Sequence, residues 1–215
     1  MKNNVTEMVF ILDRSGSMSG LEKDTIGGFN SLIAKQRGME GEALVSLVLF
    51  NASSDVVIDR KKLADVPNLD DKVYQTAGYT ALLDAVGGAI RHIGTIHKYA
   101  RPEDVPDSTL FVIVTDGMEN ASCRYSAQEI RGMIERQKEK YGWEFLFLGA
   151  NIDAVETAAH YGIGADRAVN YHADSLGTAV NYEALEHATR AVRAGAPLTS
   201  AWKDEVEKDY MRRKR

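Results

Sequence analysis

The chain has 215 residues, of which 44% are hydrophobic and 27% charged, and its formal net charge is −5. Such a composition is typical of a soluble globular protein that can bury a core without disulfides or structural metals. The mild negative charge argues against a nucleic-acid-binding protein, and we interpret the basic residues at 211–215 as a solvated tail. Because neither a signal peptide nor an apolar run of ~18 residues is found, we expect a cytoplasmic protein without a membrane partner.

Cys123 is the only cysteine, which excludes an intrachain disulfide and a zinc site built from cysteines. No base stands near it in the sequence, so we interpret it as an inert thiol. The histidines show no metal-ligand spacing and are expected on the surface or hydrogen-bonded in the core: His92, His97, His160, His172 and His187.

Four apolar runs predict buried strands, at 8–12, 43–50, 109–115 and 143–150. They are rich in Val, Leu, Ile and Phe without clean alternation, as is typical of strands covered on both faces. Segment 53–59 follows a tight turn and predicts an antiparallel edge strand, and 166–171 is a sixth candidate.

Helical periodicity alternates with these strands, at 20–37, 80–93, 126–140, 152–162 and 175–195. Ser19 with Glu22, and Ser126 with Glu129, have the spacing of capping boxes. The Gly27–Gly28 pair predicts close packing of the first helix on the sheet. Strands alternating with helices indicate an α/β fold with a mostly parallel sheet, and 60–79 and 94–108 are expected to be irregular connections.

Two carboxylates end predicted strands, Asp13 after the first run and Asp116 after the run at 109–115. If these strands are neighbours, both carboxylates lie at the carboxyl edge of the sheet, where ligands bind in such folds. Two close carboxylates repel unless a cation or a proton lies between them. In an extended loop Ser15 and Ser17 share a face with Asp13, and oxygen ligands suit Mg²⁺, Mn²⁺ or Ca²⁺.

Thr80, in "GYT", is a candidate for a further oxygen ligand. Taken alone, it is better explained as the N-cap of the helix that follows it. The presence of the two other oxygen-rich loops favours the ligand role.

The segments "DRSGSM", "GYT" and "VIVTDG" resemble the three loops of a von Willebrand factor A (VWA) domain with its metal-ion-dependent adhesion site (MIDAS). The resemblance, closest to intracellular bacterial members, implies a Rossmann-like, doubly wound, six-stranded sheet with helices on both faces and one antiparallel edge strand. It also implies five metal ligands: Asp13, Ser15, Ser17, Thr80 and Asp116. It covers 1–195 and points to a partner ATPase or modification enzyme.

Residues 196–215 lie outside this resemblance and form a C-terminal extension. Trp202, Val206 and Tyr210 recur every four residues, which predicts a final helix whose Trp202 face packs on the domain. A disordered tail is the alternative.

Two classes of function follow from the site. A metal-dependent hydrolase or phosphatase could use Asp13 as its nucleophile, as in the haloacid-dehalogenase-like phosphatases. Those enzymes need a second acid two residues later, where this chain has Ser15. With no positioned base either, we favour a metal-dependent protein-interaction module and assign no catalytic residue.

An Asp or Glu of the partner is expected to replace a water on the metal. The start of the helix after Thr80 should favour the same carboxylate. The expected rim of the interface comes from the same loops: Arg14, Met18, Tyr79, Met118, Glu119 and Asn120.

Overall fold

The protein is described by a computed structural model that covers residues 4–213 and is built on a six-stranded sheet of order β3-β2-β1-β4-β5-β6. The strands are β1 (Val5–Asp13), β2 (Glu42–Phe50), β3 (Ser54–Lys62), β4 (Ser108–Thr115), β5 (Glu144–Gly149) and β6 (Ala168–Asn170). Neighbouring strands are parallel except β2 and β3, so the predicted antiparallel edge strand is confirmed.

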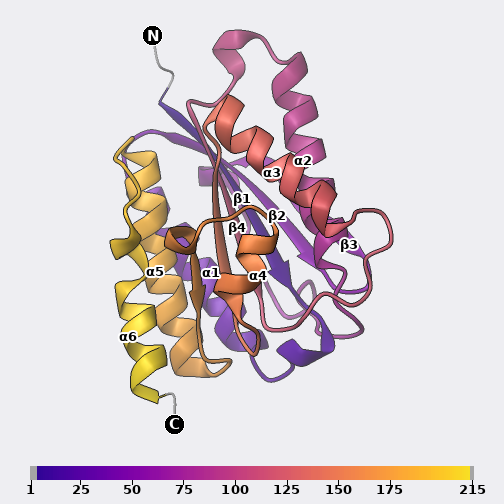
Figure 1. Ribbon diagram of the computed structural model, residues 1–215. Coiled ribbons are helices and arrows are strands. Elements are labelled where there is room, and N and C mark those ends of the chain that lie inside the picture. The colour runs from indigo at the N-terminus through magenta and orange to yellow at the C-terminus, as the bar shows by residue number, and fades with distance from the viewer. Residues whose placement is uncertain (1–3, 214–215) are drawn as a thin grey trace.

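The helices are α1 (Glu22–Arg37), α2 (Leu82–Tyr99), α3 (Ala127–Tyr141), α4 (Ala154–His160), α5 (Ser175–Arg193) and α6 (Asp204–Arg213). Short 3-10 turns occupy Gly16–Met18, Leu63–Asp65, Pro102–Asp104, Ala165–Arg167 and Ser200–Lys203. Helices α1, α5 and α6 cover one face of the sheet, and α2, α3 and α4 cover the other (Figure 1). Alternate side chains of β1 supply both cores, Phe10 on the first face and Ile11 on the second.

Two connections that the sequence left irregular are partly regular. The predicted helix ended at residue 93, but α2 continues to Tyr99. Its apolar stripe runs on from Ile93 to Ile96. Strand β3 extends to Lys62 past a register shift against β2, and Arg60 there has a φ of 43°. Its polar, exposed residues belong to an edge strand, so hydrophobic patterning could not reveal them.

The first helix begins differently from the prediction. Its N-cap is Leu21 and makes no side-chain cap, so the Ser19–Glu22 capping box is wrong. Glu22 instead accepts the Gly20 N–H at 2.7 Å and the Thr76 hydroxyl at 2.6 Å. These hydrogen bonds lower the pKa of Glu22, that from Thr76 most. The capping box of Ser126 and Glu129 at α3 is confirmed.

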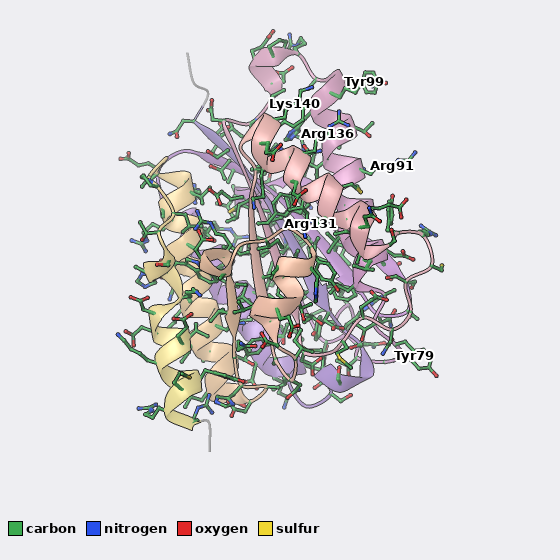
Figure 2. The ribbon with its side chains drawn as sticks, viewed as in Figure 1. Tyr79, Arg91, Tyr99, Arg131, Arg136 and Lys140 are labelled. Carbon is green, nitrogen blue, oxygen red and sulfur yellow. The ribbon has the colours of Figure 1, made fainter. Side chains whose placement is uncertain are left out.

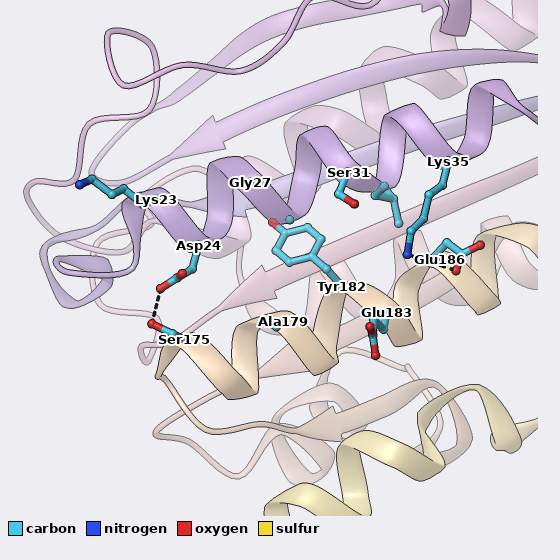
Figure 3. A pocket seen from close by; sticks show the side chains of 12 residues that line it. Lys23, Asp24, Gly27, Ser31, Lys35, Ser175, Ala179, Tyr182, Glu183 and Glu186 are labelled. Atoms are coloured by element: carbon cyan, nitrogen blue, oxygen red, sulfur yellow. Dashed lines mark hydrogen bonds and ion pairs between the residues drawn. The ribbon is translucent and has the colours of Figure 1, made fainter.

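The glycine pair in α1 does allow close packing, but against α5 rather than the sheet. A Cβ on Gly28 would lie 2.2 Å from the ring of Tyr182, whereas one on Gly27 would meet nothing within 4 Å. Figure 3 shows the Tyr182 ring reaching from α5 toward α1 between the two helices. Gly28 therefore sets the separation of α1 and α5 over that face of the sheet.

The C-terminal extension is part of the core. Trp202 and Val206 are 6% and 2% exposed and join the same apolar cluster as the strands, which confirms the predicted helix up to Arg213. Arg213 pairs with Asp174 and Asp209, so at this residue the solvated-tail interpretation is wrong. Residues 214–215 lie outside the described residues. None of the helices between residues 4 and 213 is both long and apolar enough to cross a membrane.

Candidate functional site

Three loops meet beyond the carboxyl ends of β1 and β4, and backbone hydrogen bonds hold them together. The Gly16 N–H donates to the Gly78 carbonyl at 3.0 Å, and the Ala77 N–H donates to the Arg14 carbonyl at 2.9 Å. The Asn120 N–H donates to the Thr80 carbonyl at 3.0 Å. The loops after β1, β3 and β4 therefore occupy fixed positions relative to one another.

Asp13, the last residue of β1, is fully buried. Its Oδ1 accepts the Ser15 N–H at 2.7 Å and its Oδ2 accepts the Thr115 hydroxyl at 2.6 Å, while Tyr74 donates its hydroxyl to the Asp13 carbonyl. Burial raises the pKa of Asp13 above its ordinary value, although the hydrogen bonds from Thr115 and Ser15 oppose this rise. The carboxylate is thus oriented by its neighbours but electrostatically unfavourable without a cation.

Asp116 is linked to Asp13 through two hydroxyls. The Oγ atoms of Ser15 and Ser17 lie 3.0 Å apart, and Ser17 donates to Asp116 Oδ1 at 2.6 Å. The other oxygen, Oδ2, is buried and has no hydrogen-bond partner among residues 4–213. Burial raises the pKa of Asp116, the Ser17 hydrogen bond opposes it, and the nearby charge of Asp13 raises it further.

Thr80 lies near Gly117, the residue that follows Asp116. A Cβ on Gly117 would come within 3.2 Å of Ser17 Oγ and 3.5 Å of Thr80 Oγ1, so both hydroxyls face the small space that this glycine leaves. The N-cap of α2 is Ala81, and no side chain caps it from that position, so the alternative role of Thr80 as the N-cap is wrong.

The structure therefore brings all five predicted ligands together, with two carboxylates and three hydroxyls around one region. A buried carboxylate oxygen without a partner is costly, and a cation removes that cost. No group of three or more His, Cys, Asp or Glu that could hold a metal occurs in residues 4–213, so a transition-metal site rich in such ligands is not found there. An oxygen-only donor set of this kind fits a hard divalent cation.

The predicted rim is only partly on the surface. Tyr79 and Met118 are 69% and 74% exposed, and Figure 2 shows Tyr79 projecting from its loop. Met18 is 2% exposed, so its place in the rim is wrong: it turns into the fold within the 3-10 turn. Arg14 forms an ion pair with Asp55 of β3.

Glu119 and Asn120 hold the loops rather than projecting freely. Glu119 accepts the Leu83 N–H of α2 at 2.9 Å and the Ser122 N–H and hydroxyl at 2.7 Å each. Asn120 Oδ1 accepts the Thr80 N–H at 2.9 Å. The first turn of α2 is thus already capped by a carboxylate of this chain, and the helix N-terminus that we expected to favour a partner's acid is occupied.

Sequence reasoning missed Thr115 and Tyr74, which orient Asp13. The parallel register pairs Leu12 with Val114, which places Thr115 beside Asp13, and this could have been inferred once β1 and β4 were taken as neighbours. Tyr74 carries no local signal, because it reaches Asp13 from the long connection before α2.

No protein-family model and no curated protein matches the sequence. Solved structures do match it. They include proximal thread matrix protein 1 from the mussel byssus, with a TM-score of 0.60 and 15% identity over 89% of this chain and 46% of that one. A von Willebrand factor type A structure from Catenulispora acidiphila gives a TM-score of 0.55 and 16% identity over 86% and 42% of the two chains.

The ArnB paralog VWA2 from Sulfolobus acidocaldarius matches with a TM-score of 0.51 and 17% identity over 92% of this chain and 46% of that one. Another structure of the mussel protein has a zinc-occupied MIDAS motif, with a TM-score of 0.60 and 13% identity over 88% and 45% of the chains. This chain spans less than half the length of these structures. At such identities the likeness concerns the fold: the chain has the Rossmann-like α/β fold of a VWA domain.

Proposed function

We propose that this protein is a metal-dependent protein-interaction module. The observation that carries the proposal is the buried, unpartnered Oδ2 of Asp116, beside hydroxyls that link this residue to Asp13. Asp13, Ser15, Ser17, Thr80 and Asp116 would hold Mg²⁺, with Mn²⁺ or Ca²⁺ as substitutes. The likeness to VWA structures, one with an occupied MIDAS, supports this assignment.

When bound, the cation supplies an electrophilic position for an oxygen ligand from another molecule. Ser17 is exposed while the other four proposed ligands are buried, so the site opens to solvent on the Ser17 side. The partner presents an Asp or Glu there, and Tyr79 and Met118 flank it as an adaptable apolar edge. An ATPase or a modification enzyme is our candidate for this partner, and we propose neither a nucleic-acid nor a membrane ligand.

Calorimetry with Mg²⁺, Mn²⁺ and Ca²⁺ tests the metal site. A cation that binds only the folded chain raises its stability by about 2.7 kcal/mol at a concentration one hundred times Kd. Asp13→Ala should remain folded and lose both the heat of binding and the rise in melting temperature. Asp71→Ala, at an exposed residue, is the matched control and should behave as wild type. The site is wrong if wild type shows no binding at millimolar cation.

The interaction is tested with a partner recovered by pull-down in Mg²⁺, whose affinity for this chain is then measured in Mg²⁺ and in EDTA. Its affinity should fall in EDTA and for Thr80→Ala. Equal affinity in Mg²⁺, in EDTA and for Thr80→Ala would leave a purely structural ion and refute the proposal.

Catalysis is a separate outcome. We expect no turnover of p-nitrophenyl phosphate with Mg²⁺ or Mn²⁺. A metal-dependent hydrolysis that Asp13→Asn abolishes would overturn the interaction module in favour of a metal-dependent hydrolase.

A further inference from the structure

A groove of about 490 Å³ lies at the end of the sheet opposite the candidate metal site, between α2, α3 and the start of β4. We call it the α2–α3 groove, and the residues that matter here are Arg91, Lys98, Val105, Met133, Arg136 and Trp143. In Figure 2, Arg91 and Arg136 lie on α2 and α3, far from Tyr79 beside the metal site. The groove is thus separate from the surface used in the proposed function.

The rim of the groove carries unneutralised positive charge. Arg91, Lys98 and Arg136 are exposed, and none of them forms an ion pair with another residue in the range 4–213. Among the described residues, Asp107 is the one carboxylate that lines the groove, and its Oδ2 accepts the Val5 N–H at 3.3 Å. The groove is lined by these three cations and one carboxylate, so its local charge is positive although the net charge of the chain is −5. The groove therefore attracts anionic groups.

The floor of the groove is apolar and closely packed. Trp143, which is 5% exposed, stacks on Phe111 with ring centroids 5.2 Å apart. His97 contacts the Trp143 ring edge-on at 5.4 Å, and its Nε2 lies 3.2 Å from Oε2 of the buried Glu7. Met133 and Val105 are half-buried beside this floor. A floor that is already ordered loses little entropy when a ligand binds.

Gly94 keeps the groove open. It lines the groove in the middle of its α2 wall, and a Cβ there would lie 3.9 Å from the Trp143 ring and 3.7 Å from Gln137. The space is therefore large enough for a methyl group, but a longer side chain at this position would extend over the floor.

We propose that the α2–α3 groove binds an extended acidic peptide segment with one large apolar or aromatic anchor. The anchor lies on Trp143 and Met133, and its neighbouring Asp or Glu residues meet Arg91, Lys98 and Arg136. The α2 wall from Ile90 to Lys98 is about 12 Å long at 1.5 Å per residue, which accommodates roughly four extended residues. The apolar floor and the small number of cations on the rim favour a peptide over a nucleic acid, whose binding depends on many phosphate contacts.

A random decapeptide library displayed on phage, panned against the full chain, supplies the probe. Each round is counter-selected on Gly94→Leu, whose side chain fills the groove. We expect the enriched peptides to combine Asp or Glu with Phe, Leu or Trp. As synthetic fluorescent peptides they should bind wild type more weakly as salt rises, because the contacts are charged.

Two variants locate the binding, and the second of them plays no part in the selection. Gly94→Leu and the triple variant Arg91→Gln, Lys98→Gln, Arg136→Gln should each lower the affinity at least tenfold. Gly88→Leu is the control for the first, because a Cβ at Gly88 meets nothing within 4 Å. Lys61→Gln, Lys62→Gln, Lys72→Gln is the control for the second and removes three exposed cations elsewhere. EDTA should leave the affinity unchanged, which separates this surface from the metal site.

The proposal is overturned if no peptide survives the counter-selection, or if the enriched peptides lack acidic residues. It is also overturned if the Gln triple variant binds them as tightly as its control. Tighter binding of a single-stranded dT oligonucleotide than of any enriched peptide, lost in the Gln triple variant, would assign the groove to nucleic acid instead.

Discussion

The hydroxyl of Ser17 donates a 2.6 Å hydrogen bond to Oδ1 of Asp116, 99 residues further along the chain. This bond joins the loop after β1 to the loop after β4 and orients a carboxylate whose other oxygen is buried without a partner in the described chain. Ser17 is therefore both a proposed ligand and the residue that positions Asp116.

Ser17→Ala should weaken the binding of Mg²⁺ at least tenfold. A hydrogen bond to a charged group contributes about 1.5–3 kcal/mol, and 1.4 kcal/mol corresponds to tenfold in affinity. Isothermal titration calorimetry measures the change. Ser19→Ala, at an exposed serine whose Oγ lies 3.1 Å from Thr76 Oγ1, is the control and should bind as wild type. Equal affinities of the two variants would remove Ser17 from the site.

Asp84 connects the first turn of α2 to the loop that follows Asp116. Its carboxylate accepts the N–H groups of Cys123, Arg124 and Tyr125 at 3.0, 2.8 and 3.1 Å. Burial raises the pKa of Asp84, but these hydrogen bonds outweigh it, so the pKa is lowered overall.

Asp84→Ala should lower the free energy of unfolding by about 1 kcal/mol, because water can reach the freed N–H groups and replace part of the lost bonding. For a chain of this size that corresponds to roughly 2–4 °C in melting temperature. Thermal unfolding followed by circular dichroism measures it, with Asp71→Ala as the control. A melting temperature identical to the control would show that this loop is held by other contacts.

Asp174 has two roles that substitution can separate. It caps α5 by accepting the Gly177 N–H at 2.8 Å, and it pairs with Arg213 of α6 at 2.5 Å. Asp174→Asn retains a good N-cap and loses the ion pair, so it should reduce stability only slightly. Asp174→Ala loses both and should cost about 1 kcal/mol more in unfolding free energy.

The same residue predicts a pH dependence. Burial raises the pKa of Asp174, but the Gly177 N–H and the Arg213 charge outweigh it and lower the pKa below 3.8. A carboxylate whose pKa is lower in the folded than in the unfolded chain contributes stability that is fully present above the unfolded-state pKa and is lost as the pH falls through the folded-state pKa. The stability difference between wild type and Asp174→Asn should therefore shrink between about pH 5 and pH 2 in urea titrations. A constant difference across this range would exclude the ion pair as its source.

Trp202 anchors the C-terminal extension. Its ring is buried, and its Nε1–H donates to the Asp166 carbonyl at 2.9 Å. Trp202→Ala should lower the free energy of unfolding by about 3–5 kcal/mol, as is usual for a large aromatic side chain in a core. Met211→Ala, at a side chain that is 69% exposed, is the control. Deletion from Ala201 onward should destabilise similarly, and an unchanged melting temperature would mean that the extension does not contribute to the core.

Local sequence determined most of the sheet and the convergence of the site. The apolar runs that end at Asp13 and before Asp116 are fully buried parallel strands, because only side chains covered on both faces are apolar without alternation. Parallel strands end on the same edge, so the two carboxylates had to meet once β1 and β4 were neighbours. The periodicity of Trp202 and Val206 likewise predicted which side chains of the last segment are buried, although Trp202 lies in the 3-10 turn before α6.

The tertiary structure alone decided which side chains of the loops project into solvent and which are buried or hydrogen-bonded. Glu119 and Met18 looked like surface residues in a loop, but Glu119 caps α2 and Met18 is buried. The α2–α3 groove was equally invisible, because it depends on Gly94 lying over Trp143. Sequence patterns report the period of a single helix or strand, whereas the partner of a side chain depends on segments that come together only on folding.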